Sequence, residues 1–192
     1  MPTNYSRILV VDIESTCWEP SPPEGQVSEI IEIGVASLDI NDLTSRKDKT
    51  ITIKPVDSQV SEFCTQLTGI TQDLVDLEGI PFKKGCKILE QEHDSKELVW
   101  ASWGDYDREM FQSQCERTET SYPFKKKHIN ISCLFAIAQK LNRETSIPKA
   151  LEILGLNFDG SLHRGIDDAY NAARLLGHML LNFSHDYTMK ES

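Results

Sequence analysis

The chain has 192 residues, of which 39% are hydrophobic and 26% charged, and its formal net charge is −10. This length suits one domain with a sizeable core, and the composition is ordinary for a soluble globular protein. No apolar run is long enough to span a membrane. The negative charge argues against a protein that binds nucleic acid through a basic surface, an argument that weakens if some acidic residues bind cations.

The N-terminus lacks the basic segment, apolar stretch and small-residue cleavage site of a signal peptide, so we expect a cytoplasmic location. The five cysteines are odd in number and widely scattered, without a CxxC pair. They indicate neither a zinc site nor a disulfide framework, and we expect reduced, mostly buried thiols. The sequence indicates no membrane contact and does not identify a protein partner.

The first part of the chain predicts strands. Residues 7–13, rich in branched apolar side chains, predict a central strand, and residues 29–39 predict a second. Residues 49–54 alternate in polarity and predict a third strand, which Pro55 ends. The close succession of these strands favours antiparallel pairing. Residues 97–102 predict a fourth strand that lies among helices.

Helices predominate after the third predicted strand. Thr71 is expected to cap a short helix, and Pro148 is expected in the first turn of another. The longest amphipathic pattern is near the end of the chain, and the polar tail from Ser184 is expected to be frayed. The predicted helices cover residues 61–67, 72–77, 81–95, 106–116, 131–142, 148–154 and 165–182.

The order of these elements predicts the fold class. Strands come mostly early and helices mostly late, with one strand among the helices, which favours an α/β or α+β protein with a mixed sheet covered by helices. The chain shows no internal repeat, no low-complexity tract and no long linker. We therefore expect a single domain over residues 1–192, with a core at about residues 7–182.

Two carboxylates end the first predicted strand. Asp12 and Glu14 stand two residues apart, so both side chains point to the same side of an extended chain. Two ionised carboxylates at this spacing repel each other, so either one holds a proton or a cation is present. Mg²⁺ and Mn²⁺ prefer carboxylate oxygens. Taken alone, however, the pair is explained more simply as a solvated strand end.

Two later segments add acidic residues in similar places. Asp105 and Asp107 follow the strand at residues 97–102, and strand ends on one side of a sheet are where α/β sites are built. His163 precedes the last helix, and Asp167 and Asp168 lie in its first turn, where the helix dipole alone favours an acid. The combination of all three segments is more informative than any one of them.

In this order the acidic segments resemble the three motifs of the DEDDh 3′–5′ exonucleases, over about residues 7–182. The stretch "DIESTCWE" resembles the enhanced-RNAi and histone-mRNA exonuclease branch, as do "SEIIEIGVASLD", "CTQLTGIT" and "WGDYDREMFQSQC". The resemblance implies an RNase H-like fold, with a mixed five-stranded sheet flanked by helices. It also implies that the protein cleaves single nucleotides from 3′ ends.

Carried over position by position, the family's four acidic residues match Asp12, Glu14, Asp107 and Asp168, and its general base matches His163. Two of these choices rest on register. Asp107 is preferred to Asp105 because two apolar residues follow it at the spacing of the family's second motif. Asp168 is preferred to Asp167 because it stands five residues after His163.

The resemblance also implies residues that line the pocket for the terminal nucleotide. They are Thr16 and Trp18, after the first acidic pair, and Leu67 and Thr68, in the "LTGIT" turn. Aromatic stacking on bases is tolerant of sequence, but Trp18 fits equally well as an aromatic that packs on the sheet edge. Leu67 is of a type more often found in a core. The basic run 125–127 can contact phosphates, although such a run is usually a solvated face.

The implied chemistry is metal-assisted phosphodiester hydrolysis. Two Mg²⁺ or Mn²⁺ ions, about 3.5–4 Å apart, can activate a water and stabilise charge at phosphorus and at the leaving oxygen. In this hypothesis Asp12 bridges the ions, Glu14 and Asp168 complete one site, and Asp107 acts directly or through water. His163 takes a proton from the attacking water, a role that suits the ordinary imidazole pKa of roughly 6.5.

The leading hypothesis is therefore an exonuclease acting on 3′ ends of single-stranded nucleic acid and releasing nucleoside 5′-monophosphates. RNA is favoured over DNA, although the sequence does not locate the group that reads a 2′-hydroxyl. One alternative is a catalytically silent nucleic-acid-binding or regulatory module on the same fold. Against it, all five expected site positions carry a competent residue. Another alternative is an endonuclease.

Overall fold

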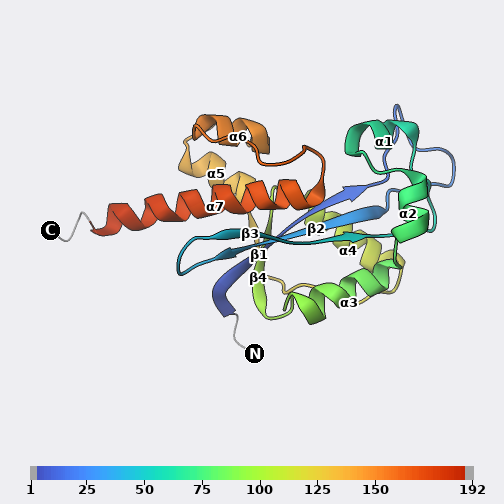
Figure 1. Ribbon diagram of the computed structural model, residues 1–192, viewed down its shortest axis with the longest axis horizontal. Helices are drawn as coiled ribbons and strands as arrows, with labels where there is room; N and C mark the ends of the chain where they lie inside the picture. Colours follow the sequence, from blue (N-terminus) through green and yellow to red (C-terminus); the bar gives the residue numbers. More distant parts are fainter. Residues whose placement is uncertain (1–3, 189–192) are drawn as a thin grey trace.

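A mixed five-stranded sheet forms the centre of the computed structural model (Figure 1). The structure describes residues 4–188, with side chains as far as residue 182. In space the strands follow the order β3-β2-β1-β4-β5. β1, β2 and β3 pair antiparallel, whereas β4 and β5 are parallel to β1. The strands are β1 (Asn4–Ser15), β2 (Ile30–Asp39), β3 (Ser45–Thr52), β4 (Leu98–Ser102) and β5 (His128–Asn130).

The predicted mixed five-stranded sheet flanked by helices is confirmed, and so is the antiparallel pairing of the first three strands. The third strand begins four residues before the predicted start at residue 49, and it ends at Thr52. β5 was not predicted from the residues themselves. It has three residues, too few for an alternating pattern to stand out from a loop.

The seven helices of the described chain largely follow the predicted ranges. They are α1 (Glu62–Thr68), α2 (Gln72–Glu78), α3 (Phe82–Glu92), α4 (Tyr106–Arg117), α5 (Ile131–Ala138), α6 (Ile147–Ile153) and α7 (Gly165–Thr188). The predicted ends of α3 and α5, at residues 95 and 142, were wrong. Asp94 and Lys140 have φ angles of 53° and 54°, a left-handed conformation that a right-handed helix cannot include.

Local signals at the helix ends were read correctly. The Thr71 side chain accepts a hydrogen bond from the backbone N–H of Leu74 and caps α2, as expected. Pro148 lies in the first turn of α6. The last helix continues to Thr188, so the chain is helical for part of the tail that we expected to be frayed. The rest of that tail, residues 189–192, lies outside the described residues.

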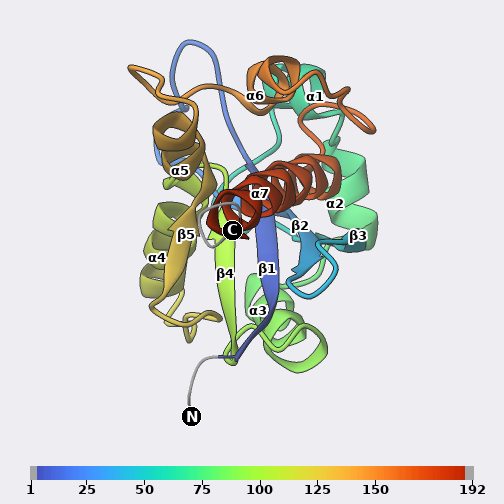
Figure 2. The same ribbon diagram turned by 90° about the vertical axis from the view of Figure 1, so that its left-hand side faces the viewer.

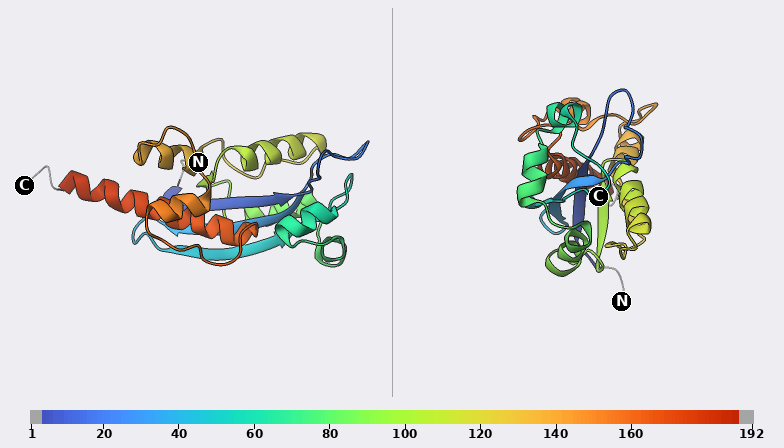
Figure 3. Two further views of the ribbon diagram at one scale, coloured as in Figure 1. Left: turned by 90° about the horizontal axis from the view of Figure 1, so that it is seen from above. Right: turned by 90° about the vertical axis from the view of Figure 1, so that its right-hand side faces the viewer.

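Helices cover both faces of the sheet (Figure 2). Because side chains alternate along β1, Ile8 and Val10 pack with α5, α6 and α7, whereas Leu9 and Val11 pack with α3 and α4. A third, smaller cluster joins β2 to α1 and α2. These two short helices lie at the end of the sheet away from the C-terminal end of α7 (Figure 3). Within the described chain, no helix is both long enough and apolar enough to cross a membrane.

A close backbone contact places the first turn of α7 on the sheet. A Cβ atom added to Gly34 in β2 would lie 1.9 Å from the carbonyl carbon of Gly165, so only glycine fits at this position. Gly34 is also the β2 partner of Asp12 in the register between β1 and β2. The N-terminus of α7 therefore lies beside the acidic end of β1.

Candidate active site

A cavity of about 460 Å³ opens where the carboxyl end of β1 meets the N-terminal turns of α4, α6 and α7. β1 and β4 are parallel, so the acidic end of β1 and the turn after β4 lie at the same edge of the sheet. All five residues predicted as metal ligands or general base line this cavity. The lining residues are Asp12, Ile13, Glu14, Trp103, Tyr106, Asp107, Ser146, Ile147, Pro148, Leu162, His163 and Asp168.

Three carboxylates converge in the cavity. Each of Asp12, Glu14 and Asp168 offers an oxygen atom, and these atoms lie within 4.8 Å of one another. Alternation along β1 turns Asp12 and Glu14 to the cavity, while Ile13 between them contributes to the core. Asp168 comes from the first turn of α7, which the glycine contact holds against β2. A compact set of carboxylate oxygens is the donor set that Mg²⁺ and Mn²⁺ prefer.

Asp107 occupies the first turn of α4 and is 4% exposed. One oxygen of its carboxyl group accepts a hydrogen bond of 2.9 Å from the backbone N–H of Ile13. This bond fixes Asp107 between the two acidic residues of β1. Asp107 does not belong to the group of three converging carboxylates, but it lines the same cavity.

The geometry separates each preferred acid from its neighbour in sequence. The Asp105 side chain is 44% exposed and forms an ion pair of 2.9 Å with Arg108, outside the cavity. Asp167 forms an ion pair of 2.7 Å with Lys47, also outside the cavity. Asp105 and Asp167 therefore have surface partners, whereas Asp107 and Asp168 face the site.

Burial raises the pKa of every carboxyl group in this set. The pKa of Asp12 lies well above its ordinary value because of burial, with further increases from Asp107 and Asp168. Burial and the nearby Asp168 raise the pKa of Glu14 to about 8. Burial also raises the pKa of Asp107 to about 7, against the lowering effect of the Ile13 N–H. A divalent cation would replace the protons that the carboxyl groups otherwise hold.

His163 lies in the exposed turn before α7, at the mouth of the cavity. Its φ angle of 59° is left-handed, which is uncommon for a residue other than glycine. Burial raises the pKa of Asp168 to about 6, while the charge of His163 and the backbone N–H groups of His163 and Arg164 lower it. His163 and Asp168 are thus close enough to interact.

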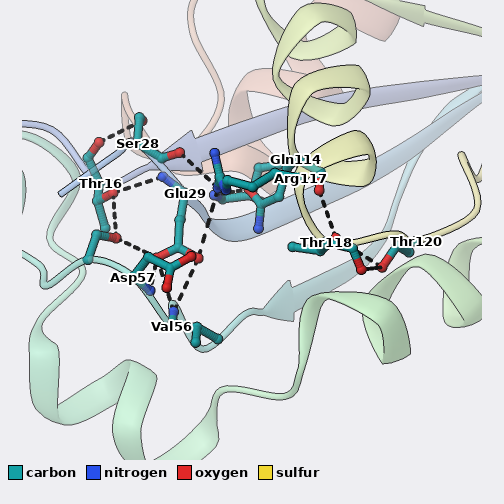
Figure 4. A network of polar contacts seen from close by, with 11 residues as sticks. Thr16, Ser28, Glu29, Val56, Asp57, Gln114, Arg117, Thr118 and Thr120 are labelled. Atoms are coloured by element: carbon teal, nitrogen blue, oxygen red, sulfur yellow. Dashed lines mark hydrogen bonds and ion pairs between the residues drawn. The ribbon is translucent and has the colours of Figure 1, made fainter. Parts of the chain in front are cut away.

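The four residues predicted to contact a nucleotide lie outside the cavity lining. Thr16 is fully buried, where its hydroxyl accepts the backbone N–H of Glu29 and lies 3.0 Å from the Ser58 hydroxyl. Figure 4 shows this network, in which the Glu29 carboxylate also accepts the N–H of Asp57. Through these bonds the Thr16 side chain braces the end of β1. Trp18, by contrast, is half-buried.

The other two predicted contacts belong to α1. Leu67 is 41% exposed, whereas the buried Thr68 hydroxyl donates to the carbonyl of Cys64. The hydroxyl of Ser61 donates to the Cys17 carbonyl at 2.6 Å and ties α1 to the chain that follows Glu14. The roles of Thr16, Trp18, Leu67 and Thr68 stay predictions.

Several cavity residues were not predicted as site residues. Tyr106 is 54% exposed, and its hydroxyl lies 2.8 Å from that of Ser15. Its position next to Asp107 in the sequence was the one signal that could have indicated a place in the site. Leu162 and the start of α6 also line the cavity, and their sequence carried no polar signal. Trp103 also lines the cavity, and its indole N–H donates to the carbonyl of Thr145.

The chain resembles known nucleases. Residues 9–176 match a protein-family model described as an exonuclease, RNase_T. The 3′-5′ exoribonuclease 1 of Rattus norvegicus is 38% identical over 186 residues, which are 92% of this chain and 53% of that protein. The human 3′-5′ exoribonuclease 1 is 36% identical over 188 residues, with the same coverage of 92% and 53%. The chain thus spans about half the length of the curated relatives it matches.

A solved structure extends this comparison to the fold. The nuclease domain of 3′hExo, described as a DEDDh family member bound to rAMP, superposes with a TM-score of 0.82. It is 34% identical in sequence, and the match covers 95% of each chain.

Proposed function

This chain belongs to the exonuclease family whose model matches residues 9–176, and we propose that it is a metal-dependent 3′–5′ exonuclease. In this proposal it hydrolyses the terminal phosphodiester bond of single-stranded nucleic acid, preferably RNA, and releases nucleoside 5′-monophosphates. The observation that carries the proposal is the convergence of three carboxylates within 4.8 Å, in one cavity with Asp107 and His163. The family itself supports divalent-metal dependence.

The donor set suits Mg²⁺ or Mn²⁺, and the proposal assigns two ions to the site. Asp12, Glu14 and Asp168 would hold metal directly, since their oxygens converge. Asp107 would contribute directly or through water, because its carboxyl group is held by the Ile13 N–H at the edge of this cluster. When bound, the ions supply an activated water and stabilise the charge that develops on the phosphate.

The protein's own contribution is to accept a proton and to place the terminal nucleoside. His163, exposed at the cavity mouth, is placed to accept a proton from water that approaches the carboxylate cluster. Tyr106 and Leu162 form exposed apolar walls on which a terminal nucleoside can rest. Thr16, Trp18, Leu67 and Thr68 remain further candidates for nucleotide contact through the segment and helix that border the site.

RNA is the preferred substrate in this proposal because of the relatives. The matched proteins of Rattus norvegicus and Homo sapiens are named exoribonucleases. Another related structure, 33% identical, describes 3′-end-specific recognition of a histone mRNA stem-loop by a 3′-exonuclease. We extend only the shared chemistry, a single-stranded RNA 3′ end, to this chain. We also propose that residues 7–182 form the core of one exonuclease domain. A cytoplasmic location stays a prediction.

A time course on labelled oligonucleotides tests the proposal. A single-stranded RNA labelled at its 5′ end, a DNA of the same sequence and an RNA with a blocked 3′ end would be incubated with Mg²⁺, Mn²⁺ or a chelator. We expect a ladder of single-nucleotide steps from the 3′ end, strongest on RNA, that disappears with the chelator and with the blocked end.

Each other outcome of this time course excludes a part of the proposal. Internal cuts that persist on the blocked RNA would identify an endonuclease. Binding of folded protein to the oligonucleotide without any cleavage would identify a catalytically silent module. Equal rates on RNA and DNA would remove the substrate preference but leave the reaction in place.

A further inference from the structure

A further buried carboxylate, Glu32, lies beside the site and has no role in the proposed chemistry. Glu32 is 1% exposed and is the β2 partner of Glu14 in the antiparallel register. It does not line the cavity and is not one of the three converging carboxylates. Because burying a charged carboxylate is costly unless it is paired, its partners indicate what it does.

The partners of Glu32 come from the start of α7. Arg164 donates from Nη2 to Oε2 at 2.9 Å and from Nε to Oε1 at 3.4 Å. The backbone N–H of Gly165, the first residue of α7, donates to Oε1 at 2.9 Å. An acid from β2 thus caps the N-terminus of α7 and holds the guanidinium group in a two-point contact.

This contact supports the turn that carries His163. Ser161, Leu162 and His163 are all exposed, and His163 has the left-handed φ angle of 59°. The N–H of Ser161 bonds to the carboxylate of Asp167 at 2.9 Å, within the same turn. Arg164 follows His163 directly in the chain, and its guanidinium group ties it to Glu32 in the sheet. A side chain on an exposed turn keeps one position only if such a neighbour fixes the backbone.

We propose that Glu32 and Arg164 are positioning residues, which hold the backbone of His163 at a fixed place relative to the carboxylate cluster. The proposal rests on the proposed function, since it concerns the placement of the general base. Arg164 is not among the described residues that line the cavity. In this proposal Arg164 acts through the backbone of His163 and not by contact with the substrate.

The first turn of α7 also offers a matched control. Lys47 in β3 forms ion pairs with Asp167, at 2.7 Å, and with Asp159, at 2.9 Å. Its side chain is 35% exposed, close to the 37% of Arg164. Both cations thus join a strand to the start of α7, but Lys47 lies outside the cavity and makes no contact beside His163.

The kinetic test compares Arg164→Met, Arg164→Lys and Lys47→Met with the unsubstituted protein. On 5′-labelled RNA in Mn²⁺, we expect Arg164→Met to lower kcat by about 10- to 100-fold, because a small misplacement of a catalytic group has effects of that size. KM should change by less than about twofold, since Arg164 does not bind the substrate. Arg164→Lys should recover part of the loss, and Lys47→Met should keep kcat within about twofold.

Three kinetic results would overturn the proposal. One is an unchanged kcat in Arg164→Met. Another is an equal loss of kcat in Arg164→Met and Lys47→Met, which would indicate general destabilisation of α7. The third is a raised KM with an unchanged kcat, which would make Arg164 a substrate-binding residue.

A measurement without turnover separates this proposal from the proposed function. Hydrogen–deuterium exchange of the backbone amides of residues 163–165 should be faster in Arg164→Met than in the unsubstituted protein, and unchanged in Lys47→Met. If the unsubstituted protein trims no 3′ ends, the proposed function fails, while the exchange rates still decide whether Arg164 holds this turn. Unchanged exchange in Arg164→Met would overturn the positioning role.

Discussion

At the scale of single residues, the structure distinguishes side chains that are neighbours in sequence. Asp105 and Asp107 stand at the start of α4, but the backbone N–H of Ile13 bonds to Asp107 only, while Asp105 faces Arg108 at the surface. The motif register already favoured Asp107. The hydrogen bond gives that preference a physical basis, because it places this carboxyl group between the two acids of β1.

This difference predicts opposite outcomes for two similar substitutions. Asp107→Asn should lower kcat by about 100-fold or more, because it removes a charge that would stabilise metal and phosphate. Asp105→Asn loses an exposed ion pair and should change kcat by less than about twofold. Initial rates on 5′-labelled RNA in Mn²⁺ measure both. A larger loss of kcat in Asp105→Asn than in Asp107→Asn would assign the site role to Asp105 in place of Asp107.

His163 supports a second prediction at this scale. His163→Ala should lower kcat by about 10²- to 10⁴-fold, the usual contribution of a general base. The rise in melting temperature on adding Mn²⁺ should remain, because the imidazole is not part of the carboxylate cluster. The two measurements together test the role. Lost stabilisation by Mn²⁺ with retained turnover would contradict it.

At the scale of elements, the site depends on how closely α7 approaches β2. The contact between Gly34 and Gly165 lets two backbones meet, and it brings Asp168 to the end of β1. Both glycines are visible in the sequence. Their pairing across 131 positions of the chain is not, because a glycine alone does not show which backbone will approach it.

Gly34→Ala should therefore damage both stability and activity. Its Cβ would meet backbone atoms of Gly165 and Ile166 at 1.9–2.2 Å, which cannot move as a side chain can. We expect a loss of about 3 kcal/mol in the free energy of unfolding, the upper range for overpacking. Chemical denaturation measures this loss.

Gly177→Ala in α7, the helix that Gly34 contacts, is the control for that substitution. Its Cβ would first meet the Cδ1 atom of Leu38 at 3.1 Å, a side-chain atom that can shift. Alanine also favours a helix by about 1 kcal/mol over glycine. We expect unfolding free energy within about 1 kcal/mol of the unsubstituted protein. Equal effects of the two substitutions would contradict the backbone contact.

At the scale of the whole molecule, the carboxylate cluster makes stability depend on pH and on metal. The folded-state pKa values of Asp168, Asp107 and Glu14 are raised to about 6, 7 and 8. The unfolded chain loses these protons near its ordinary carboxyl pKa of about 4, whereas the folded protein still holds them at higher pH. The folded state thus binds more protons over this range, so stability falls as pH rises.

We therefore predict that the metal-free protein melts at a higher temperature at about pH 5 than at about pH 8, with the decline spread over the three raised pKa values. Differential scanning fluorimetry in a chelator measures this. Millimolar Mg²⁺ or Mn²⁺ should remove most of the decline, because the cation replaces the protons. A melting temperature that rises with pH in the chelator would contradict the prediction.

Asp12→Asn provides a separate test of the same cluster. Burial and its neighbours Asp107, Asp168 and Glu14 oppose ionisation of Asp12. The uncharged amide should therefore raise the melting temperature of the metal-free protein at about pH 8. It should also reduce the gain that Mn²⁺ gives, because a ligand is lost. Thermal melts with and without Mn²⁺ compare the two proteins, and an undiminished gain would exclude Asp12 as a ligand.

The sequence by itself determined most of the elements and indicated the kind of chemistry. Branched apolar runs, caps and turn residues act over a few positions, so β1, β2, β4 and the starts of all seven helices of the described chain were predicted within a few residues. The acidic motifs indicated the family and five site residues for the same reason, since each motif is local. β5, with three residues, has too short a pattern to be read in this way.

Only the tertiary structure decided which groups meet. The bond from Ile13 to Asp107 joins residues 94 positions apart, and that from Gly165 to Glu32 joins residues 133 apart. In the sequence Glu32 is one acid in an apolar strand, and only the tertiary structure places Arg164 and the start of α7 against it. Such contacts depend on the packing of whole elements around the sheet, and no local pattern of residues specifies them.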